Sequence, residues 1–225
     1  MSDSDLRELE RLWQDSQSVE DEAMYMLALM RCALLPEPNA ELAAALGNQA
    51  AARATARDPS ARVDAPLPRN DADLVRRLAG LDAPNRGRAC ARAAYSIALR
   101  CLDRWRHAFL DCTRFYAALE AVRDWTDGLA SDAEALAHRL TDTDEDSVLL
   151  PETDPRARAA VTCIRTAEGM VGWQSGTALR PLLNSVIEAG RFSLGDTFLG
   201  GVQQVQLAIR EGLEPWLLGS PGAAP

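Results

Sequence analysis

The sequence predicts an all-α fold, a bundle of about eight to nine helices with a small helical unit at its N-terminal end. Alanine and leucine supply much of the 47% hydrophobic content, and both lose little side-chain freedom in a helix. β-Branched residues are few and scattered, so a sheet has little to build on. Apolar side chains recur at helical spacing between start and stop signals along most of the 225 residues.

Two helices are expected at the start of the chain. Over residues 5–15, leucines and a tryptophan recur at helical spacing, with charged residues on the other side. Ser18 and Asp21 then form a capping box, which opens a second helix from Val19 to about Leu34. Two prolines end this helix.

Two shorter elements follow. Asn39 is expected to cap a third helix that ends near Gly47, and Asn48 to start a further alanine-rich turn or two. Residues 1–56 are therefore predicted to form a small N-terminal helical module. Residues 57–70 hold three prolines without sustained periodicity, which predicts a linker.

Residues 71–218 are predicted to form the main helical domain, and residues 219–225 a flexible tail. Ser131 with Glu134 makes another capping box, and Asp154 followed by proline is a strong helix start. The helices of this domain are expected at residues 71–79, 86–110, 111–127, 131–140, 155–173, 177–189 and 196–212.

The charge of the chain excludes several classes of function. A net charge of −9 and a pI near 4.8 exclude direct nucleic-acid binding, because a polyanion requires a basic surface that displaces its counterions. Such a protein can instead attract a basic protein partner, although the same charge also serves solubility. The sequence contains no lysine, which excludes Schiff-base chemistry, a lysine general base and the lysine of a P-loop.

The cysteines and the N-terminus favour a cytoplasmic protein. None of the five cysteines forms a C-x-x-C pair, so reduced thiols are the simplest account. The polar opening MSDSDLRELE is unlike a signal peptide, and no apolar run reaches the roughly 20 residues that span a bilayer, so no membrane contact is expected. Cys90, Cys101 and Cys112 are spaced by eleven residues, about 16 Å along a helix, and are expected to pack in the core rather than bind zinc.

No catalytic residue, metal ligand or cofactor is predicted. Asp103 precedes His107 by four residues and could orient its imidazole on a helix, but no nucleophile or metal motif accompanies the pair. Asp142, Asp144 and Asp146 open a D-x-D-x-D calcium loop. The glycine and the glutamate that such a loop needs at its sixth and twelfth positions are missing.

Two groups of residues are the candidate partner-binding sites. One is the acidic loop at residues 141–154, and the other is a helix–turn–helix corner that concentrates aromatic and arginine side chains, which are enriched at binding hot spots. A solvated loop and a packed core rim are the alternative interpretations. The candidates are Asp142, Asp144, Glu145 and Asp146 in the loop, and Trp105, Arg106, His107 and Arg114 at the corner.

Two stretches resemble known families. LRELERLWQDSQSVEDEAMYMLALMRCALL, followed by ELAAALGNQAAARA, resembles a short helical companion module at the ends of planctomycete and myxobacterial multidomain proteins. The later part of the chain is similar to helical immunity proteins of bacterial toxin systems. The residues that carry this second resemblance are Trp105, Phe109, Ala117, Leu119, Glu120, Ala121, Trp125 and Gly128. Together the resemblances imply a non-enzymatic protein that acts by binding another protein.

The leading hypothesis is a cytoplasmic, regulatory interaction protein of a bacterial conflict or defence system. It would act like an immunity protein, occluding a basic protein partner encoded nearby. One alternative is a structural subunit of a larger complex, or a regulator released by a protease that cuts at residues 57–70 or 141–154. Another is a helical small-molecule binder or enzyme with a pocket lined by His107 and Trp173. A deep pocket with a histidine or carboxylates of perturbed pKa would favour that alternative.

Overall fold

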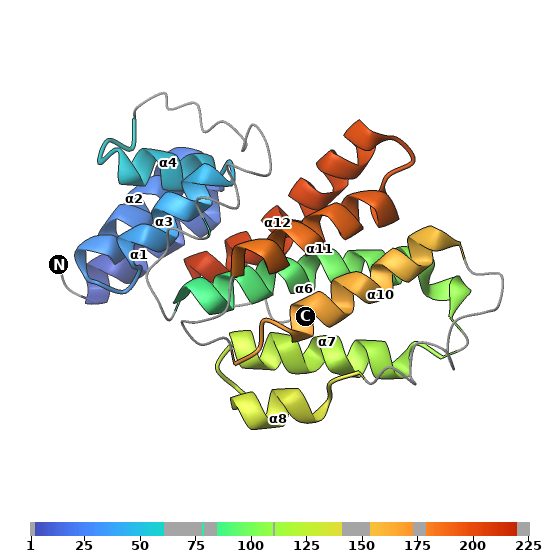
Figure 1. Ribbon diagram of the computed structural model, residues 1–225. Coiled ribbons are helices and arrows are strands. Elements are labelled where there is room, and N and C mark those ends of the chain that lie inside the picture. The colour runs from blue at the N-terminus through green and yellow to red at the C-terminus, as the bar shows by residue number, and fades with distance from the viewer. Residues whose placement is uncertain are drawn as a thin grey trace. The chain divides into compact units, whose positions relative to one another are not determined.

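The computed structural model describes residues 3–60, 78, 85–109, 111–140, 154–172 and 179–219. Over these residues the chain forms ten α-helices, one 3₁₀ helix and no β-strand, which confirms the predicted all-α class (Figure 1). The N-terminal helices pack together into a small unit, as the sequence predicts. The α-helices are α1 (Asp3–Ser16), α2 (Val19–Arg31), α3 (Glu37–Ala45), α4 (Gln49–Thr55), α6 (Asn85–Trp105), α7 (Thr113–Thr126), α8 (Asp132–Ala137), α10 (Pro155–Glu168), α11 (Leu179–Leu194) and α12 (Phe198–Leu218).

The chain divides into two compact units. The first comprises residues 1–77 and 214–225, and the second comprises residues 78–213. Of the predicted linker, residues 57–60 follow α4, and residues 61–70 lie outside the described residues. The helix expected at residues 71–79, apart from Leu78, and the tail beyond Gly219 also lie outside them.

The first unit is built on small side chains. Helix α2 packs against α1 and α4, and α3 packs against α4. Alanine allows these short helices to approach closely, because its side chain ends at the β-carbon. The fully buried alanines are Ala23, Ala40, Ala43, Ala51 and Ala54.

The two asparagines of the first unit have different roles. Asn48 caps α4 as predicted, since its side-chain oxygen accepts a bond of 2.6 Å from the Ala51 N–H. The prediction that Asn39 caps α3 is wrong. The helix starts earlier, at Glu37, because proline is favoured in the first turn, where its missing N–H costs nothing. The Asn39 amide instead donates to the Leu217 carbonyl at 3.2 Å.

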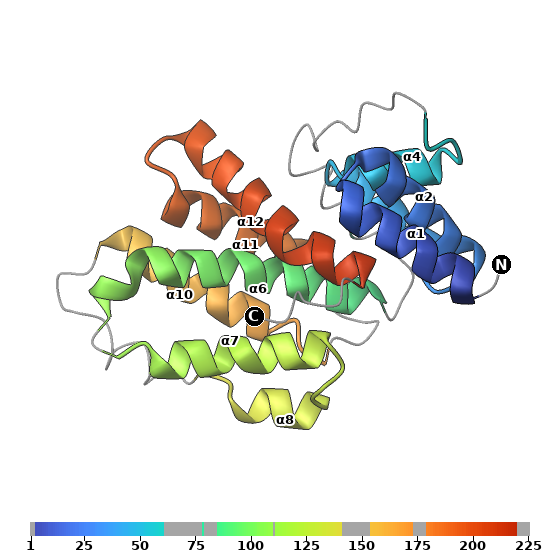
Figure 2. The ribbon, with the colours of Figure 1, turned by 180° about the vertical axis from the view of Figure 1, so that it is seen from behind.

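The second unit is organised around α6. This helix packs against α7, α10 and α11, while α10 also contacts α7 and α11, and α8 covers α7 (Figure 2). The local start signals are found where predicted: Ser131 and Glu134 make a complete capping box, and Asp154 caps α10 ahead of Pro155. Short-range hydrogen bonds therefore define where these helices begin.

A buried arginine connects three segments of the second unit. The Arg92 guanidinium donates from Nη1 to Asp127 Oδ1 at 3.2 Å and to Thr126 Oγ1 at 3.3 Å. Its Nε donates to the Gly212 carbonyl at 3.3 Å, and its Cζ lies 5.2 Å from the centroid of the Tyr95 ring. Arg92 on α6 thus binds the end of α7 and the backbone of α12.

A glycine brings α11 close to α6. A β-carbon at Gly190 would overlap Cγ2 of Ile97 and lie 3.2 Å from Cγ2 of Val205. Ile97 and Val205 are fully buried, so neither has free space into which it can move. The absence of a side chain at Gly190 therefore sets the distance between these helices.

Several helix ends differ from the prediction. Helix α2 stops at Arg31 rather than Leu34, because Ala33 adopts a left-handed backbone with φ of 57°. Helix α6 ends at Trp105 and continues only as the 3₁₀ helix Arg106–Ala108. Helix α10 ends at Glu168 instead of residue 173. In the opposite direction, α12 continues past residue 212 to Leu218, and it contains Pro215.

Candidate functional site

The second unit presents apolar side chains to solvent at the turn between α11 and α12. Phe192 is 54% exposed, Phe198 is 74% exposed and Leu199 is 72% exposed. The two phenylalanines line a cavity of about 540 Å³. Its other principal side chains are those of Arg156, Glu188, Arg191 and Asp196. We call this surface the α11–α12 corner.

Close backbone contact makes the turn at this corner. A β-carbon at Gly195 would lie 2.6 Å from the Gly201 Cα, and one at Gly201 would overlap the Arg191 carbonyl. Thr197 then caps α12 by accepting the Gly200 N–H at 3.1 Å. This tight turn allows Phe198, at the start of α12, to line the same cavity as Phe192, near the end of α11.

Side chains from α6 and α10 hold the corner in place. The Trp105 indole donates to the Ser193 carbonyl at 2.9 Å, and Arg104 donates to the Leu194 carbonyl at 2.8 Å. Asp196 accepts from Arg104 at 2.8 Å and from Arg156 at 3.1 Å. The end of α6, the start of α10 and the turn between α11 and α12 lie together at one end of the second unit (Figures 1 and 2).

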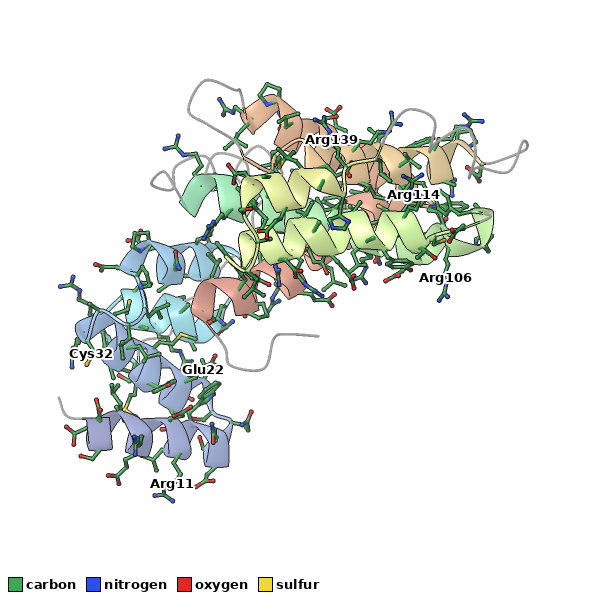
Figure 3. All side chains as sticks on the ribbon, turned by 90° about the horizontal axis from the view of Figure 1, so that it is seen from below. Arg11, Glu22, Cys32, Arg106, Arg114 and Arg139 are labelled. Atoms are coloured by element: carbon green, nitrogen blue, oxygen red, sulfur yellow. The ribbon has the colours of Figure 1, made fainter. Side chains whose placement is uncertain are left out.

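The predicted helix–turn–helix residues are distributed around this end of the unit. Trp105 is half-buried and binds the corner, and His107 tilts against it with ring centroids 5.8 Å apart. Arg106, His107 and Arg114 are exposed, and Arg106 extends away from the helices (Figure 3). The other candidates, Asp142, Asp144, Glu145 and Asp146, lie outside the described residues.

The pairing of Asp103 with His107, which the sequence left open, is not formed. Asp103 accepts a hydrogen bond of 2.6 Å from the Tyr116 hydroxyl instead. The pairing required α6 to continue through His107, but the chain tightens into a 3₁₀ helix at Arg106, which changes the direction of the following side chains. The carboxylate is thereby used to join α6 to α7.

The buried cysteines are packing groups. Cys90, Cys101 and Cys163 are buried, as predicted for Cys90 and Cys101, and the Sγ atoms of Cys101 and Cys163 lie 3.9 Å apart between α6 and α10. Burial raises the pKa of Cys90 to about 12, which keeps it a thiol. Cys112 is only half-buried and stands just before α7. Among the described residues, no group of three or more histidine, cysteine, aspartate or glutamate side chains could hold a metal ion.

The acidic charge is concentrated in the first unit. Residues 3–60 contain eleven acidic residues and five arginines, whereas the described part of the second unit contains twelve acidic residues and fifteen arginines. Eight of the eleven acidic residues lie within residues 3–22. Over its whole length, however, the second unit also has a negative net charge of −3, because residues 78–213 contain eighteen acidic residues and fifteen arginines, and the first unit has −6.

Glu168 is the one buried carboxylate in the part of the second unit that the structure describes. Its Oε1 accepts the backbone N–H of Leu140 at 2.8 Å, so it holds the chain just before the predicted acidic loop. Burial raises the pKa of Glu168, while the bond from Leu140 and the charges of Arg139 and Arg165 oppose that rise. Glu168 does not line the cavity at the α11–α12 corner, and its bond to Leu140 gives it a structural role.

Glu168→Gln is expected to be more stable than the parent protein at neutral pH, because the amide oxygen still accepts the Leu140 N–H without a buried charge. A raised pKa means that protonation favours the folded parent, so the difference in unfolding free energy should shrink as the pH falls through the pKa of Glu168. Denaturant unfolding of both proteins across this pH range measures it. Glu168→Leu, which removes the acceptor, is the control and should be less stable at every pH. A glutamine variant that matched the leucine variant would contradict the assignment.

The α11–α12 corner was missed in the sequence, although two phenylalanines flank a Gly-Asp turn there. Of the two residues expected to line a pocket in the alternative hypothesis of a ligand binder, His107 is exposed and Trp173 lies outside the described residues. No helix within the described residues is long and apolar enough to cross a membrane. No family model, no curated protein and no solved structure matches this chain.

Proposed function

We propose that this chain is a non-enzymatic, cytoplasmic interaction protein that binds another protein and occludes its functional surface. The observation that carries the proposal is the α11–α12 corner. Phe192, Phe198 and Leu199 are all more than half exposed around one turn, and large apolar side chains grouped on a surface are typical of protein-binding sites. Leu129, on the turn before α8, is equally exposed but does not line the cavity at this corner.

The structure of the corner suits a preformed binding site. The bonds from Trp105, Arg104 and Arg156 fix the turn before any partner arrives. A rigid site loses less conformational entropy when a partner binds, and more of the contact energy then contributes to affinity. This arrangement supports occlusion by a preformed surface.

The charge of the chain supports a basic partner. A net charge of −9 accelerates encounter with a positively charged protein at low salt. The likeness of the sequence to helical immunity proteins supports a role in a bacterial conflict or defence system, with the partner encoded nearby.

The size of the cavity favours one alternative, a small-molecule binder. Its volume of about 540 Å³ falls within the range of about 300–1,000 Å³ that is typical of ligand pockets. A metabolite that co-purifies with the protein and competes with no protein partner would support this alternative over the first.

The test is an affinity pull-down from the native lysate at low and high salt, analysed by mass spectrometry. The parent protein should retain one stoichiometric partner, and high salt should weaken the association. The double variant Phe198→Ser/Leu199→Ser should retain at least about tenfold less of that partner, because two exposed apolar side chains are removed. Leu129→Ser is the matched control and should retain it.

Circular dichroism of each variant verifies that the fold is kept. A partner retained equally by the double variant would place the binding site elsewhere. A pull-down without any stoichiometric partner would refute the interaction role itself.

A further inference from the structure

We infer that one edge of α1 is a second docking surface, which receives a basic amphipathic helix of a partner protein. This surface, the α1 edge, consists of Leu9 and Leu12 with the acidic residues Asp5, Glu8 and Asp15. It belongs to the first unit and is separate from the α11–α12 corner. The inference depends on the proposed function only in assuming that a protein partner exists.

The first observation is that α1 is incompletely covered. It is strongly amphipathic, yet it is the one α-helix among the described residues in which no residue is buried. An amphipathic helix of a folded protein normally buries its apolar stripe against a neighbour. The apolar stripe of α1 is therefore only partly buried by the described residues of this chain.

The geometry of the α1–α2 pair explains which side is left open. The Trp13 ring stacks on Tyr25 of α2, with centroids 5.6 Å apart, so the Trp13 side of α1 is turned toward α2. Leu12 precedes Trp13 and points about 100° away from it around the helix. Accordingly, Leu12 is 40% exposed. Leu9, one turn earlier, is half-buried and continues the same edge.

Acidic residues surround this exposed leucine. Glu8 and Asp15 lie four residues before and three residues after Leu12, which makes them its neighbours on the helix surface. Asp5 is one further turn away on the same edge. Of the two arginines of α1, Arg11 borders this edge, and its Nη1 lies 3.4 Å from Asp15 Oδ2. Both side chains of that pair are about two-thirds exposed, so solvent weakens the pair and a basic partner can replace Arg11.

These features select the occupant by charge and shape. The α1 edge carries three acidic residues, Asp5, Glu8 and Asp15, against one bordering arginine, so the complementary surface is basic. An apolar row with i, i+3 spacing along a straight helix matches the apolar row of a second helix, and lysines or arginines beside that row would meet the acidic residues. Helix α1 has 14 residues, which gives a contact about 21 Å long.

The probe for this surface is a fluorescein-labelled peptide with two repeats of Leu-Lys-Lys-Leu-Leu-Lys-Leu, titrated against the full chain by fluorescence anisotropy. We expect saturable binding that weakens as salt is added, because charge attraction contributes to it. A scrambled peptide of the same composition, whose leucines do not form one stripe, should bind at least about tenfold more weakly. A peptide with glutamate in place of every lysine should not bind.

Two variants of the chain locate the site. Leu12→Gln keeps the helix propensity and should lower the affinity for the basic peptide about tenfold, because it removes the exposed apolar contact. Glu8→Gln should lower this affinity about threefold and make it less dependent on salt. Leu129→Gln, an exposed leucine of the second unit, is the matched control and should bind like the parent chain.

If the scrambled peptide bound as tightly as the amphipathic peptide, the inference would be overturned, because the attraction of basic peptides to an acidic protein would then account for all of the binding. Unchanged binding by Leu12→Gln, with the helical circular dichroism of the parent, would overturn it as well. Neither result bears on the α11–α12 corner, which is tested separately by the double variant Phe198→Ser/Leu199→Ser.

Discussion

Arg92→Met is expected to lower the unfolding free energy of the second unit by about 3 kcal/mol. Arg92 is buried and binds Asp127, Thr126 and the Gly212 carbonyl together. Methionine fills a similar space but donates no hydrogen bond. The carboxylate and carbonyl partners would then lose their donors, and removing one member of a buried network costs more than the network contributes net.

Denaturant unfolding followed by far-ultraviolet circular dichroism measures this loss. The control is Arg100→Met on the same helix, which removes the ion pair with Glu211 at 2.6 Å. Both side chains of that pair are substantially exposed, so solvent replaces the interaction and the change should stay within about 1 kcal/mol. Equal shifts for the two variants would show that the buried bonds of Arg92 do not stabilise the unit.

Gly190→Ala is expected to have the second largest effect and to lower the unfolding free energy of the second unit by about 2 kcal/mol. In an isolated helix the same change would be stabilising by about 1 kcal/mol, because glycine is a poor helix former. Here the added β-carbon would overlap Ile97, and Val205 closes the other side. The cost of forcing α11 away from α6 therefore exceeds the gain in helix propensity.

Gly169→Ala is the matched control for this substitution. Gly169 follows α10 with a φ of −65°, and an added β-carbon there would approach only carbonyl oxygens at 3.4 Å. Its stability should stay equal to that of the parent or rise slightly, as measured by the same unfolding experiment. If Gly190→Ala proved as stable as Gly169→Ala, the close contact of α11 with α6 would be excluded as a determinant of stability.

The sequence predicted the features that depend on neighbouring residues. Asn48, Ser131 and Asp154 start helices because each side chain reaches a backbone N–H only two or three residues away. The all-α class was predictable as well, because composition and the spacing of apolar residues are local properties of the sequence. Local signals of this kind are present in the sequence itself.

Features that depend on distant residues were not predictable from one sequence. Asn39 is bonded to the Leu217 carbonyl, 178 residues away, and this partner cannot be inferred from the residues around Asn39. Phe192 and Phe198 have the pattern of core residues, and their exposure depends on which helices pack over the turn. The proposed binding corner was therefore invisible until the packing of α6, α10, α11 and α12 was known.

The glycine contact between α6 and α11 has a consequence for how the specificity of this protein can evolve. Gly190 lies inside the unit, where almost any side chain would disturb the packing, whereas Phe192 is only two positions further on and faces solvent. Selection on the fold and selection on the partner thus act on separate residues of the same helix. Substitutions at the tips of α11 and α12 can redirect recognition toward a new partner while the scaffold beneath them is inherited unchanged.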